Sequence, residues 1–462
     1  MNALSLRADR ILTRYFTRPS ISWQQSMAIV LPLIAEHLFS SLFGLLNTAM
    51  ISSSGVTSLS AVSLVDTLNS LLFVFYSGIA TGASVVVANC RGSGNRDKLR
   101  EASCQAVTTV TLFTLATTVF IILFHRPLLN VLFGAAEAEI LDKARLYLLG
   151  GAFTLPLVGF CTAVCGVLRG IGEGKTSLLY TLVSTGAYVG LNVLFLTVLD
   201  MGIPGLILSI TINRITNVPM LFLFMHFRKT AFRFRLRELL RVNWNMFRSI
   251  TKIGIPCALE QLFFTGGRVV IQSIIVPLGT AAIVTYNVAY SLMIFNQAIN
   301  TPISSAMFTI VGICMGNDRP QDARELTRSY TVLCKALFVL AGGLIILFFR
   351  PLAGMYHPPE ELLSDIFLCV MISAIAHPII HPEAFMLANV FRAAGDVTYS
   401  TIISLASMWV CRVLGAYILG IVMSMGILGV WIAMLVDWLV RAILVPIRFR
   451  GDKWLRHKLV VK

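Results

Sequence analysis

The stretch IVLPLIAEHLF, residues 29–39, returns later in the chain as IGIPCALEQLF, residues 253–263. Each stretch holds a single carboxylate in a largely apolar run, Glu36 in the first and Glu260 in the second, with a proline four residues before it. The offset of 224 residues is close to half of the 462-residue chain. This spacing indicates that the chain consists of two copies of one unit.

The same register holds further along the chain. Three more pairs of stretches match, the last with a slip of one residue: LFHRPL (123–128) on LFFRPL (347–352), MGIPG (201–205) on MGILG (425–429), and VLRGIGEGKTS (167–177) on VFRAAGDVTYS (390–400). Matches that keep their order through most of each half are hard to explain by shared composition alone. The sequence therefore predicts an internal duplication.

The composition is that of a membrane protein. Hydrophobic side chains make up 56% of the chain, charged ones 13%, and the mean hydropathy is +0.81, which exceeds what a water-soluble core absorbs. An apolar helix of roughly 20 residues crosses about 30 Å of hydrocarbon. We expect twelve such spans, at residues 24–52, 58–90, 101–125, 143–168, 176–198, 204–227, 250–276, 281–314, 331–349, 361–391, 398–420 and 426–447.

Twelve spans and the duplication together predict an all-α integral membrane fold. Each copy contributes six crossings, an even number, so both copies enter the bilayer in the same orientation. We expect two six-helix bundles, at residues 24–227 and 250–447, related by a pseudo-twofold axis along the membrane normal. Bundles of this kind can rock against each other, and alternating access is the transport mechanism that follows.

The distribution of basic residues predicts the orientation. Arginines and lysines gather in the segment before the first span (1–23), in the linker between the copies (228–249) and in the tail (448–462). By the positive-inside rule both termini are cytoplasmic. The formal net charge of +15 then reflects topology and attraction to anionic lipids, and it gives no support to a nucleic-acid partner. The first segment lacks the pattern of a removable signal peptide, and we expect a bacterial inner or plasma membrane location.

Several motifs occur in a specific combination: the two proline-bearing first helices, the turns RGIGEGKT and RAAGDVT, and the closing GVWIAMLVDWLVRAI (429–443) with RFRGDKW (448–454). In this combination the chain resembles the multidrug and toxic compound extrusion (MATE) family over roughly residues 20–455. The resemblance implies a V-shaped exporter that expels large amphipathic organic molecules, often cations, driven by H⁺ or Na⁺ moving inward.

Glu36 and Glu260 are the first candidates for coupling the ion to transport. An ionisable group at this depth costs roughly 2.5–3.5 kcal/mol on insertion scales, so it usually faces a wet cavity or a partner. The proline before each acid removes a backbone donor and loosens the helix there. A protonated or hydrogen-bonded packing residue is the alternative for both positions.

Two positions depart from what the resemblance implies. Family members often carry a coupling aspartate late in helix one, in a pattern like VDTxM, whereas this chain reads LNTAM with Asn47. Helix five keeps Asn192 but has Leu196 where members with an amino-half ion site often have a second acid. Asparagine can coordinate Na⁺ but cannot release a proton near neutral pH, so Glu36 would have to carry the proton.

Arginines within the spans are further candidates. Arg214 in helix six could neutralise Glu36 if the two helices face each other, as a structural bridge or as a functional switch. Arg268 is eight residues from Glu260 on one helix, too far along the axis for direct pairing, so each needs its own partner.

Other charged and polar residues are expected to have mainly structural roles. Arg169 and Arg392, at the ends of helices four and ten, are expected to reach headgroups or to cap the glycine turns. Asp437 and Arg441 are four residues apart, the spacing of an ion pair on one helix face. Scattered polar residues on helices two and eight suit loose binding of aromatic solutes, although helix packing explains them equally well: Asp66, Asn69, Tyr76, Tyr286, Asn287, Tyr290, Asn296, Gln297 and Asn300.

Helix ten contains AHPIIHPEAF, which places His377 and His381 on one face if its two prolines leave the helix regular. Some relatives carry carboxylates near the positions of Phe264 and His381, so the carboxyl-half acid site of the family is altered here. Histidine titrates near neutral pH and could carry protons; contact with substrate and packing at a kinked helix are the other readings. No HExxH pattern or ligand set accompanies them, so we expect no metal site.

The sequence therefore predicts a secondary antiporter that exports amphipathic organic solutes, organic cations foremost, in exchange for H⁺ or Na⁺. The alternative is a flippase for lipid-linked precursors or an exporter of anionic or zwitterionic metabolites, which arginines at depth (Arg214, Arg268, Arg412) would suit. The expected partners are a small organic solute and membrane lipids, and the expected state is a monomer. The sequence shows no catalytic constellation, and we expect neither an enzyme nor a cofactor.

Overall fold

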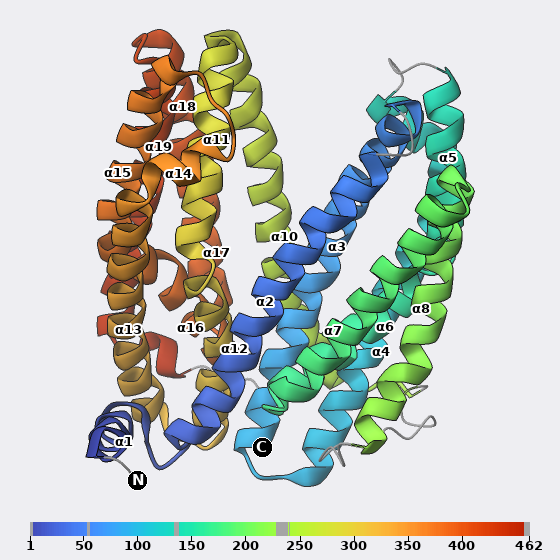
Figure 1. The fold of residues 1–462 in the computed structure, drawn as a ribbon. Coiled ribbons are helices and arrows are strands. Elements are labelled where there is room, and N and C mark those ends of the chain that lie inside the picture. The colour runs from blue at the N-terminus through green and yellow to red at the C-terminus, as the bar shows by residue number, and fades with distance from the viewer. Residues whose placement is uncertain (1–2, 53–55, 134–137, 228–238, 240, 457–462) are drawn as a thin grey trace. The chain divides into compact units, whose positions relative to one another are not determined.

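The computed structural model describes residues 3–52, 56–133, 138–227, 239 and 241–456 (Figure 1). Within these ranges, the description does not extend to the side chains of residues 3–8, 11, 41, 42, 44–52, 56–61, 63, 131–133 and 138. The chain divides into two compact units. The amino-half unit comprises Leu31–Arg91 and Asn95–Ala258, and the carboxyl-half unit comprises Met1–Val30, Gly92–Gly94 and Leu259–Lys462.

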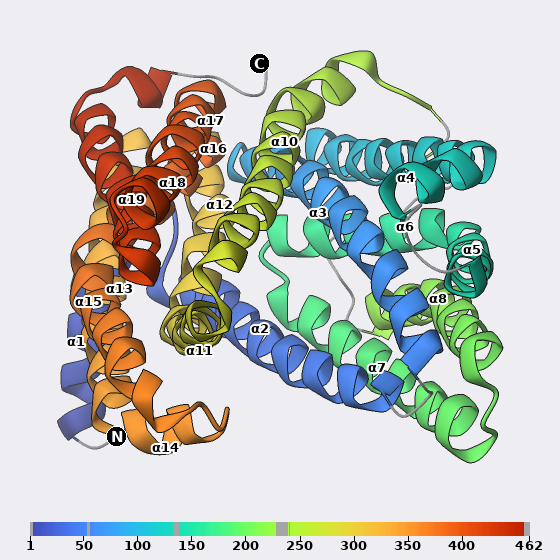
Figure 2. The ribbon, with the colours of Figure 1, turned by 90° about the horizontal axis from the view of Figure 1, so that it is seen from above.

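The amino-half unit contains most of α2 and the helices that follow it, up to the beginning of α10. Their bounds are α2 (Trp23–Ser52), α3 (Val56–Gly92), α4 (Arg96–Phe133), α5 (Ala138–Ala152), α6 (Leu155–Gly170), α7 (Gly174–Asn192), the π-helical η1 (Val193–Val198) and α8 (Gly202–Phe227). Figure 2 shows α7 running alongside α8.

The carboxyl-half unit contains α1, the beginning of α2, the end of α10 and all later helices. Their bounds are α1 (Ala3–Phe16), α10 (Trp244–Ile275), η2 (Val276–Leu278), α11 (Thr280–Gln297), α12 (Asn300–Gly316), α13 (Pro320–Leu347), α14 (Phe349–Gly354), η3 (Glu360–Leu362), α15 (Leu363–His381), η4 (Pro382–Met386), α16 (Leu387–Ala394), α17 (Val397–Ala406), η5 (Ser407–Leu414), α18 (Gly415–Tyr417), η6 (Ile418–Val422), α19 (Gly426–Arg450) and η7 (Lys453–Arg456).

Long apolar helices dominate the described part of the chain. Nine of them are long and apolar enough to cross a membrane, and two bent pairs pass the same test. Together with the thirty residues of α2, they account for the twelve expected spans. The fold is thus an all-α membrane fold built from twelve spans.

Two of the spans are bent, which the sequence did not indicate. The predicted span 143–168 consists of α5 and α6, which meet at 51°, and the span 281–314 consists of α11 and α12, which meet at 45°. Pro156 lies in the first turn of α6, and Pro302 lies near the start of α12. Because proline lacks an amide donor and restricts the residue before it, each helix begins anew at the break.

The first helix of each half belongs to both units. Helix α2 passes from the carboxyl-half to the amino-half unit between Val30 and Leu31, and α10 makes the reverse change between Ala258 and Leu259. Both changes lie within three residues of the paired prolines at 32 and 256. The compact units divide within α2 and within α10, not before these helices. The lobe boundaries expected at 24–227 and 250–447 therefore stay a prediction.

Small residues fix the beginning of α10 to α3 within the amino-half unit. A Cβ atom at Gly78 would lie 2.4 Å from Cα of Ala258, and one at Gly82 would lie 2.5 Å from the backbone nitrogen of Gly254. Gly78 and Gly82 are four residues apart, so they present one smooth face of α3. Membrane helices gain stability chiefly from such close backbone packing, because lipid tails are as apolar as the side chains.

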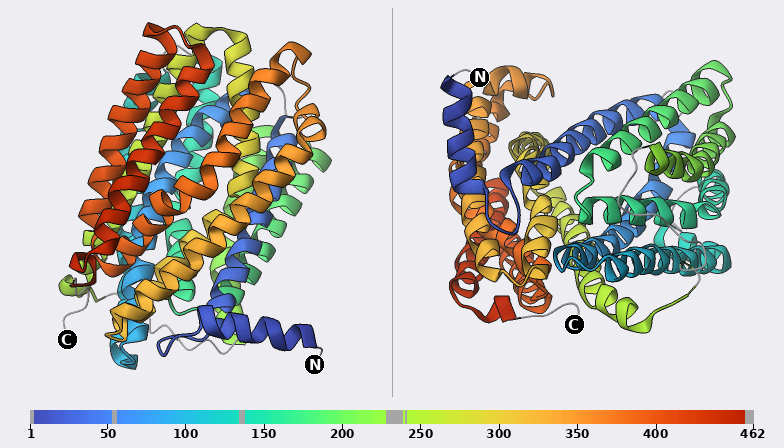
Figure 3. Two further views of the ribbon diagram at one scale, coloured as in Figure 1. Left: turned by 90° about the vertical axis from the view of Figure 1, so that its left-hand side faces the viewer. Right: turned by 90° about the horizontal axis from the view of Figure 1, so that it is seen from below.

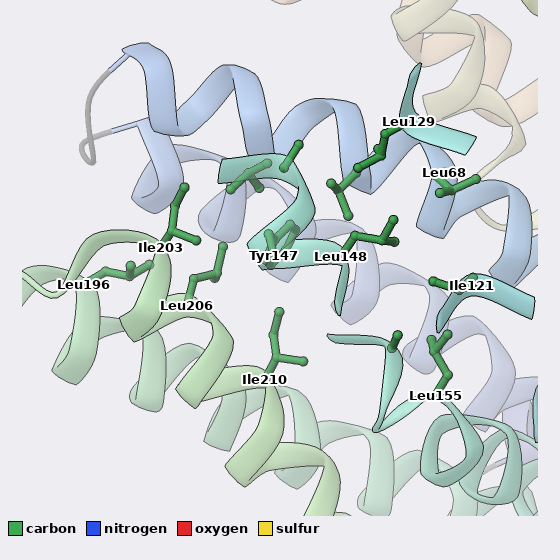
Figure 4. Packing of buried hydrophobic residues seen from close by; sticks show 14 residues of the cluster. Leu68, Ile121, Leu129, Tyr147, Leu148, Leu155, Leu196, Ile203, Leu206 and Ile210 are labelled. Atoms are coloured by element: carbon green, nitrogen blue, oxygen red, sulfur yellow. The ribbon is translucent and has the colours of Figure 1, made fainter. Parts of the chain in front are cut away.

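Apolar side chains from α3, α4, α5, α6, η1 and α8 form the core of the amino-half unit (Figure 4). Tyr147 and Leu148 of α5 pack there beside Leu206 of α8, and both α5 residues are at most 4% exposed. The core thereby holds the bent α5–α6 pair in place.

Helix α1 lies across the beginning of α13 in the carboxyl-half unit (Figures 1 and 3). The ring of Phe16 meets the edge of Tyr330 with centroids 5.0 Å apart, and Arg18 Nε donates to Glu325 Oε2 at 2.5 Å. The backbone amide of Ser20 donates to Asp322 at 3.0 Å. The basic amino-terminal segment is therefore anchored to the first turns of α13.

Candidate functional site

Glu36 is held by two other helices of the amino-half unit. Its Oε1 lies 3.3 Å from Nη1 of Arg169, at the end of α6, and accepts a hydrogen bond of 3.3 Å from Thr181 Oγ1 on α7. The side chains of Glu36 and Arg169 are 15% and 31% exposed. Glu36 is therefore a paired carboxylate, and we call this set of three residues the Glu36 clamp.

Glu260 has the same kind of partners in the carboxyl-half unit. Its Oε1 lies 2.5 Å from Nη2 of Arg392, at the end of α16, and its Oε2 accepts a hydrogen bond of 3.3 Å from Thr401 on α17. Arg392 also donates to Asn389 Oδ1 at 2.8 Å. This Glu260 clamp is more deeply buried than its counterpart, with the glutamate and arginine side chains 7% and 14% exposed.

The two clamps occupy equivalent places in the duplicated chain. Arg169 and Arg392 are the arginines that open the turns RGIGEGKT and RAAGDVT, and each threonine comes from the helix after its turn. Each of these arginines pairs with the acid of its own half, a contact that the sequence did not predict. A buried carboxylate without a partner is costly, and the arginine supplies the countercharge.

Arg214 does not neutralise Glu36, so that suggestion is wrong. Its Nη1 donates to the carbonyl of Gly151 at 2.9 Å and to Thr154 Oγ1 at 2.7 Å. Both acceptors lie at the break between α5 and α6, where the last carbonyls of α5 lack helical partners. Arg214 thereby caps the end of α5, a role that depends on a bend the sequence did not predict.

A cavity of about 600 Å³ lies beside Arg214 within the amino-half unit. Side chains from α3, α5, α6, α7 and α8 line it: Asp66, Asn69, Ser70, Phe73, Val74, Tyr76, Tyr147, Leu155, Val158, Tyr188, Ile210, Asn213 and Arg214. We call it the amino-half cavity. Pockets of a few hundred to about 1,000 Å³ with apolar walls and few polar groups are typical of sites for drug-sized ligands.

Asp66 is the carboxylate of this lining. Its Oδ1 accepts a hydrogen bond of 3.1 Å from the hydroxyl of Tyr147, and Arg214 lies within electrostatic range of both groups. Tyr76 and Tyr188 add two more phenol rings, which present an apolar face and a polar edge. The lining thus combines one carboxylate, one guanidinium and three tyrosines, a chemistry suited to amphipathic aromatic molecules.

The sequence pointed to part of this cavity. Asp66, Asn69 and Tyr76 stood out as polar residues on an apolar helix, and all three line the cavity. Tyr147 and Tyr188 were missed, because nothing in their local sequence shows which face of a helix turns inward. Tyr147 on α5 donates to Asp66 on α3, a contact between two helices that the local sequence does not show.

The two asparagines singled out in the sequence are not both described. Asn47 lies on α2, outside the residues whose side chains the structure describes. Asn192 is fully buried at the end of α7, directly before η1 and one turn after the cavity residue Tyr188. Leu196 belongs to the apolar core of the same unit.

Arg268 and Glu260 have separate partners, as their spacing predicts. Arg268 is exposed on α10, and its Nη1 donates to the hydroxyl of Tyr290 on α11 at 3.4 Å. Glu260 pairs with Arg392 instead.

His377 and His381 share one face of α15 despite the proline between them. Their rings stack with centroids 5.5 Å apart, and the rings of Phe338 and Trp438 pack around both. His377 Nδ1 lies 2.5 Å from the carbonyl of Ser373, so it carries the proton, and Nε2 accepts from the Gln297 amide at 3.1 Å. Both nitrogens of His377 are satisfied in the neutral form, which favours the packing interpretation for this residue.

Glu383, which follows these histidines, forms an ion pair with Lys335 of α13. Within the described ranges, no three histidine, cysteine, aspartate or glutamate side chains are grouped so as to hold a metal ion.

Comparison with known proteins agrees with the duplicated fold. The MatE family model matches residues 32–194 and again residues 256–418, two blocks that begin and end 224 residues apart, and together they span well over half of the chain. The chain is 24% identical to an uncharacterised transporter, YisQ, of Bacillus subtilis, with 98% of this chain and 97% of the relative covered. It is also 24% identical to the probable multidrug resistance protein NorM of Thermotoga maritima, with 95% and 94% covered.

Solved structures show the same fold. One is the outward-facing conformation of a multidrug resistance MATE family transporter of the MOP superfamily, with a TM-score of 0.83 at 17% identity over 97% of this chain and 99% of that one. Another is a MOP superfamily transporter from Pyrococcus furiosus, described as having a binding pocket of reversed polarity, with a TM-score of 0.81 at 18% identity over 96% and 97%. The two family-model matches and the duplicated twelve-span fold lead to one conclusion: this chain is a membrane transporter, not an enzyme, and belongs to the MatE family of multidrug and toxic compound extrusion proteins.

Proposed function

We propose that this transporter is a secondary antiporter that exports amphipathic organic solutes in exchange for inward H⁺ or Na⁺ by alternating access. The amino-half cavity carries the proposal. It offers about 600 Å³, phenol rings from three helices and a single carboxylate, Asp66. Such a lining can bind the apolar body of a drug-sized solute and, at one point, its positive charge.

Asp66 is the proposed coupling acid. The glutamates of the two clamps are each paired with an arginine and hydrogen-bonded by a threonine, so an ion bound there would compete with an arginine for the carboxylate. Asp66 instead accepts a hydrogen bond from Tyr147 and borders the cavity. A carboxylate in this position can bind a proton, Na⁺ or an organic cation, but only one of them at a time.

This competition supplies the exchange. An inward-moving ion that occupies Asp66 lowers its affinity for the cation, and by linkage the cation lowers the affinity for the ion to the same extent. Arg214 lies within electrostatic range of Asp66 and weakens the hold on any cation, which favours release. Asn47, which cannot release a proton near neutral pH, is not needed for this scheme.

The proposal includes a bacterial inner-membrane location with both termini in the cytoplasm, and a monomer surrounded by lipid. The support is the gathering of basic residues in the segment 1–23, in the linker 228–249 and in the tail 448–462. Accessibility of single cysteines placed at exposed positions such as Arg96 and Asp452 tests the orientation in intact cells, because both should react only after the membrane is made permeable.

The test of antiport uses inside-out vesicles with a fluorescent organic cation and a separately imposed proton or Na⁺ gradient. Wild type is compared with Asp66→Asn, Glu36→Gln and Glu260→Gln. We expect Asp66→Asn to abolish gradient-driven uptake while the protein stays folded and inserted, because the amide cannot hold a proton or balance a cation. Glu139→Gln is the matched control, since Glu139 is an exposed carboxylate paired with Lys143.

Two results would contradict the proposal. Uptake by wild type that ignores both gradients rejects antiport altogether. Uphill uptake by Asp66→Asn at the wild-type rate, with loss in Glu36→Gln, moves the coupling role to the Glu36 clamp.

A further inference from the structure

A second set of buried charges lies in the carboxyl-half unit, apart from the Glu260 clamp. Arg412 is in η5, and Asp437 and Arg441 are in α19. Their exposed fractions are 7%, 0% and 1%. Two guanidinium groups therefore share one carboxylate in the interior of a membrane-spanning unit.

Arg441 has several close partners. Its Nε donates to Asp437 Oδ1 at 2.8 Å and to Ser407 Oγ at 2.7 Å, and its Nη2 donates to the same Oδ1 at 2.6 Å. The guanidinium lies 4.5 Å from the ring centroid of Phe264 and 5.5 Å from that of Phe385. The ion pair between Asp437 and Arg441 expected from their spacing is confirmed. In this pair Arg441 neutralises the charge of Asp437.

Arg412 has much weaker partners. Its Nε lies 3.5 Å from Asp437 Oδ2, beyond a good hydrogen bond, and its Nη1 approaches Met408 Sδ at 3.8 Å. The guanidinium lies 5.4 Å from the ring centroid of Trp438. In the described part of the chain, neither the Nε of Arg412 nor the indole nitrogen of Trp438 has a hydrogen-bond acceptor, although both are buried.

The neighbouring charges do not compensate Arg412. Glu260 is within electrostatic range of Arg441 but is bound to Arg392, and Glu383 is bound to Lys335. The nearby histidines of α15 bring no negative charge. One positive charge is therefore left over, and an uncompensated cation within a membrane span is costly.

Aromatic side chains connect this charge with an exposed arginine. Tyr286 of α11 lies within electrostatic range of both Arg412 and Arg268. Its ring stacks on Tyr290 with centroids 5.6 Å apart, and the hydroxyl of Tyr290 accepts the hydrogen bond from Arg268. A solute with an aromatic body can lie along these rings with its anionic group directed to the guanidinium.

We propose that Arg412, with the N–H of Trp438, forms an anion subsite in the carboxyl-half unit that receives the carboxylate of a zwitterionic amphipathic solute. The substrate class rests on the proposed export function; the subsite itself rests on the buried, weakly partnered guanidinium. A carboxylate and a chloride ion each carry one negative charge. The anion at this subsite can therefore come from the solute or from chloride in solution. The subsite would extend export from organic cations to solutes that carry both charges.

The experiment measures equilibrium binding to the full-length protein in nanodiscs by fluorescence polarisation. The probes are a rhodamine with a free carboxylate and its methyl ester, in which a methyl group removes the negative charge. We expect Arg412→Gln to weaken binding of the free carboxylate about tenfold, equivalent to roughly 1.4 kcal/mol, and to leave the ester within about twofold. Arg350→Gln, which removes an exposed arginine of α14, is the matched control and should change neither.

Chloride distinguishes the two sources of the anion. If chloride, replacing gluconate, displaces the free carboxylate from wild type but not from Arg412→Gln, then the subsite accepts an inorganic anion as well. If chloride has no effect while the carboxylate still depends on Arg412, the solute supplies the anion. Both results support the subsite. Equal weakening of the two dyes by Arg412→Gln, or no weakening of either, overturns it.

Folding is controlled separately. Arg412→Gln should unfold at or above the wild-type temperature, since Asp437 retains Arg441 and a costly buried charge is removed, whereas Arg441→Gln should unfold at a lower temperature. If Arg412→Gln does not fold, Arg412→Lys carries the test: the lysine keeps the charge but loses the planar fork, so the preference for the carboxylate dye over its ester should shrink, and an unchanged preference overturns the proposal. Dye binding in nanodiscs is measured without a gradient, so a failure of antiport in vesicles does not affect the test of the subsite. Equally, a failure of the subsite does not affect the test of antiport.

Discussion

Glu260 Oε1 lies 2.5 Å from Nη2 of Arg392, and the duplicated chain repeats this arrangement between Glu36 and Arg169 at 3.3 Å. In both halves the first helix is thereby tied to the end of the helix that precedes the glycine turn. In both halves a proline lies four residues before the acid. The division between the two compact units lies within three residues of that proline. The acids that looked like lone coupling groups are therefore also parts of two structural ties.

Glu260→Gln should destabilise the protein more than Glu36→Gln. Glu260 and Arg392 are more deeply buried, and removal of one partner of a buried pair costs about 3–5 kcal/mol, whereas the longer and wetter Glu36 pair should cost less. Thermal unfolding of the purified variants in detergent measures the difference. Equal effects, or a larger effect at Glu36, would contradict the assignment.

Exchange of the charges of Glu260 and Arg392 tests whether their ion pair, and not another contact, stabilises the clamp. The double variant Glu260→Arg with Arg392→Glu should recover part of the stability that each single variant loses, because the opposite charges again face each other. No recovery would mean that Asn389 and Thr401, rather than the ion pair, decide the stability of the clamp.

Gly82→Ala should reduce the yield of folded protein. A methyl group at this position would lie 2.5 Å from the backbone nitrogen of Gly254, and a backbone contact cannot move aside as a flexible side chain can. Gly186→Ala on α7 is the control, because no described atom lies within 4 Å of its added methyl group. Size-exclusion chromatography of fluorescently tagged variants compares the two, and similar profiles would contradict close packing of α10 on α3.

Tyr147→Phe should weaken coupling without unfolding the protein. The change removes the hydroxyl that donates to Asp66 at 3.1 Å, a hydrogen bond to a charged group worth about 1.5–3 kcal/mol. We expect half-maximal uptake at a lower ion concentration, because the carboxylate loses a donor that stabilises its charged form, and a lower unfolding temperature in a protein that still folds. Tyr417→Phe, at a residue that is 49% exposed, serves as the control and should behave as wild type.

His377→Gln should retain gradient-driven transport. Both ring nitrogens of His377 are hydrogen-bonded in the neutral form and aromatic rings surround it, which is the environment of a packing residue. The expected loss is in thermal stability, through the contacts with Phe338 and Trp438. Loss of the response to a proton gradient in a protein that still folds would give the histidine a role in proton transfer.

Much of the fold could be predicted because it depends on local properties. The twelve spans follow from apolar segments long enough to cross a bilayer, and the match of Pro32 and Glu36 with Pro256 and Glu260 indicated the duplication. The bends at 143–168 and 281–314 could not be seen, because a proline in a membrane helix can be accommodated with or without a break.

The candidate site was predicted less completely than the fold. Spacing along one helix foresaw the pair of Asp437 with Arg441, since residues four apart share a face. Spacing could not foresee that Arg169 rather than Arg214 meets Glu36, because the three residues lie on different helices.

The sequence by itself determined the class of the protein, its duplication and the residue types available for chemistry, since composition, length and spacing are properties of the chain alone. Only the tertiary structure decided which charges meet. Helix packing brings Tyr147 to Asp66, and it leaves Arg412, within the described part of the chain, with only a 3.5 Å contact to Asp437 and a methionine sulfur as neighbours. Apolar helices can be rotated about their axes at little cost in lipid, so close contacts between their side chains, rather than their hydrophobicity, select the arrangement.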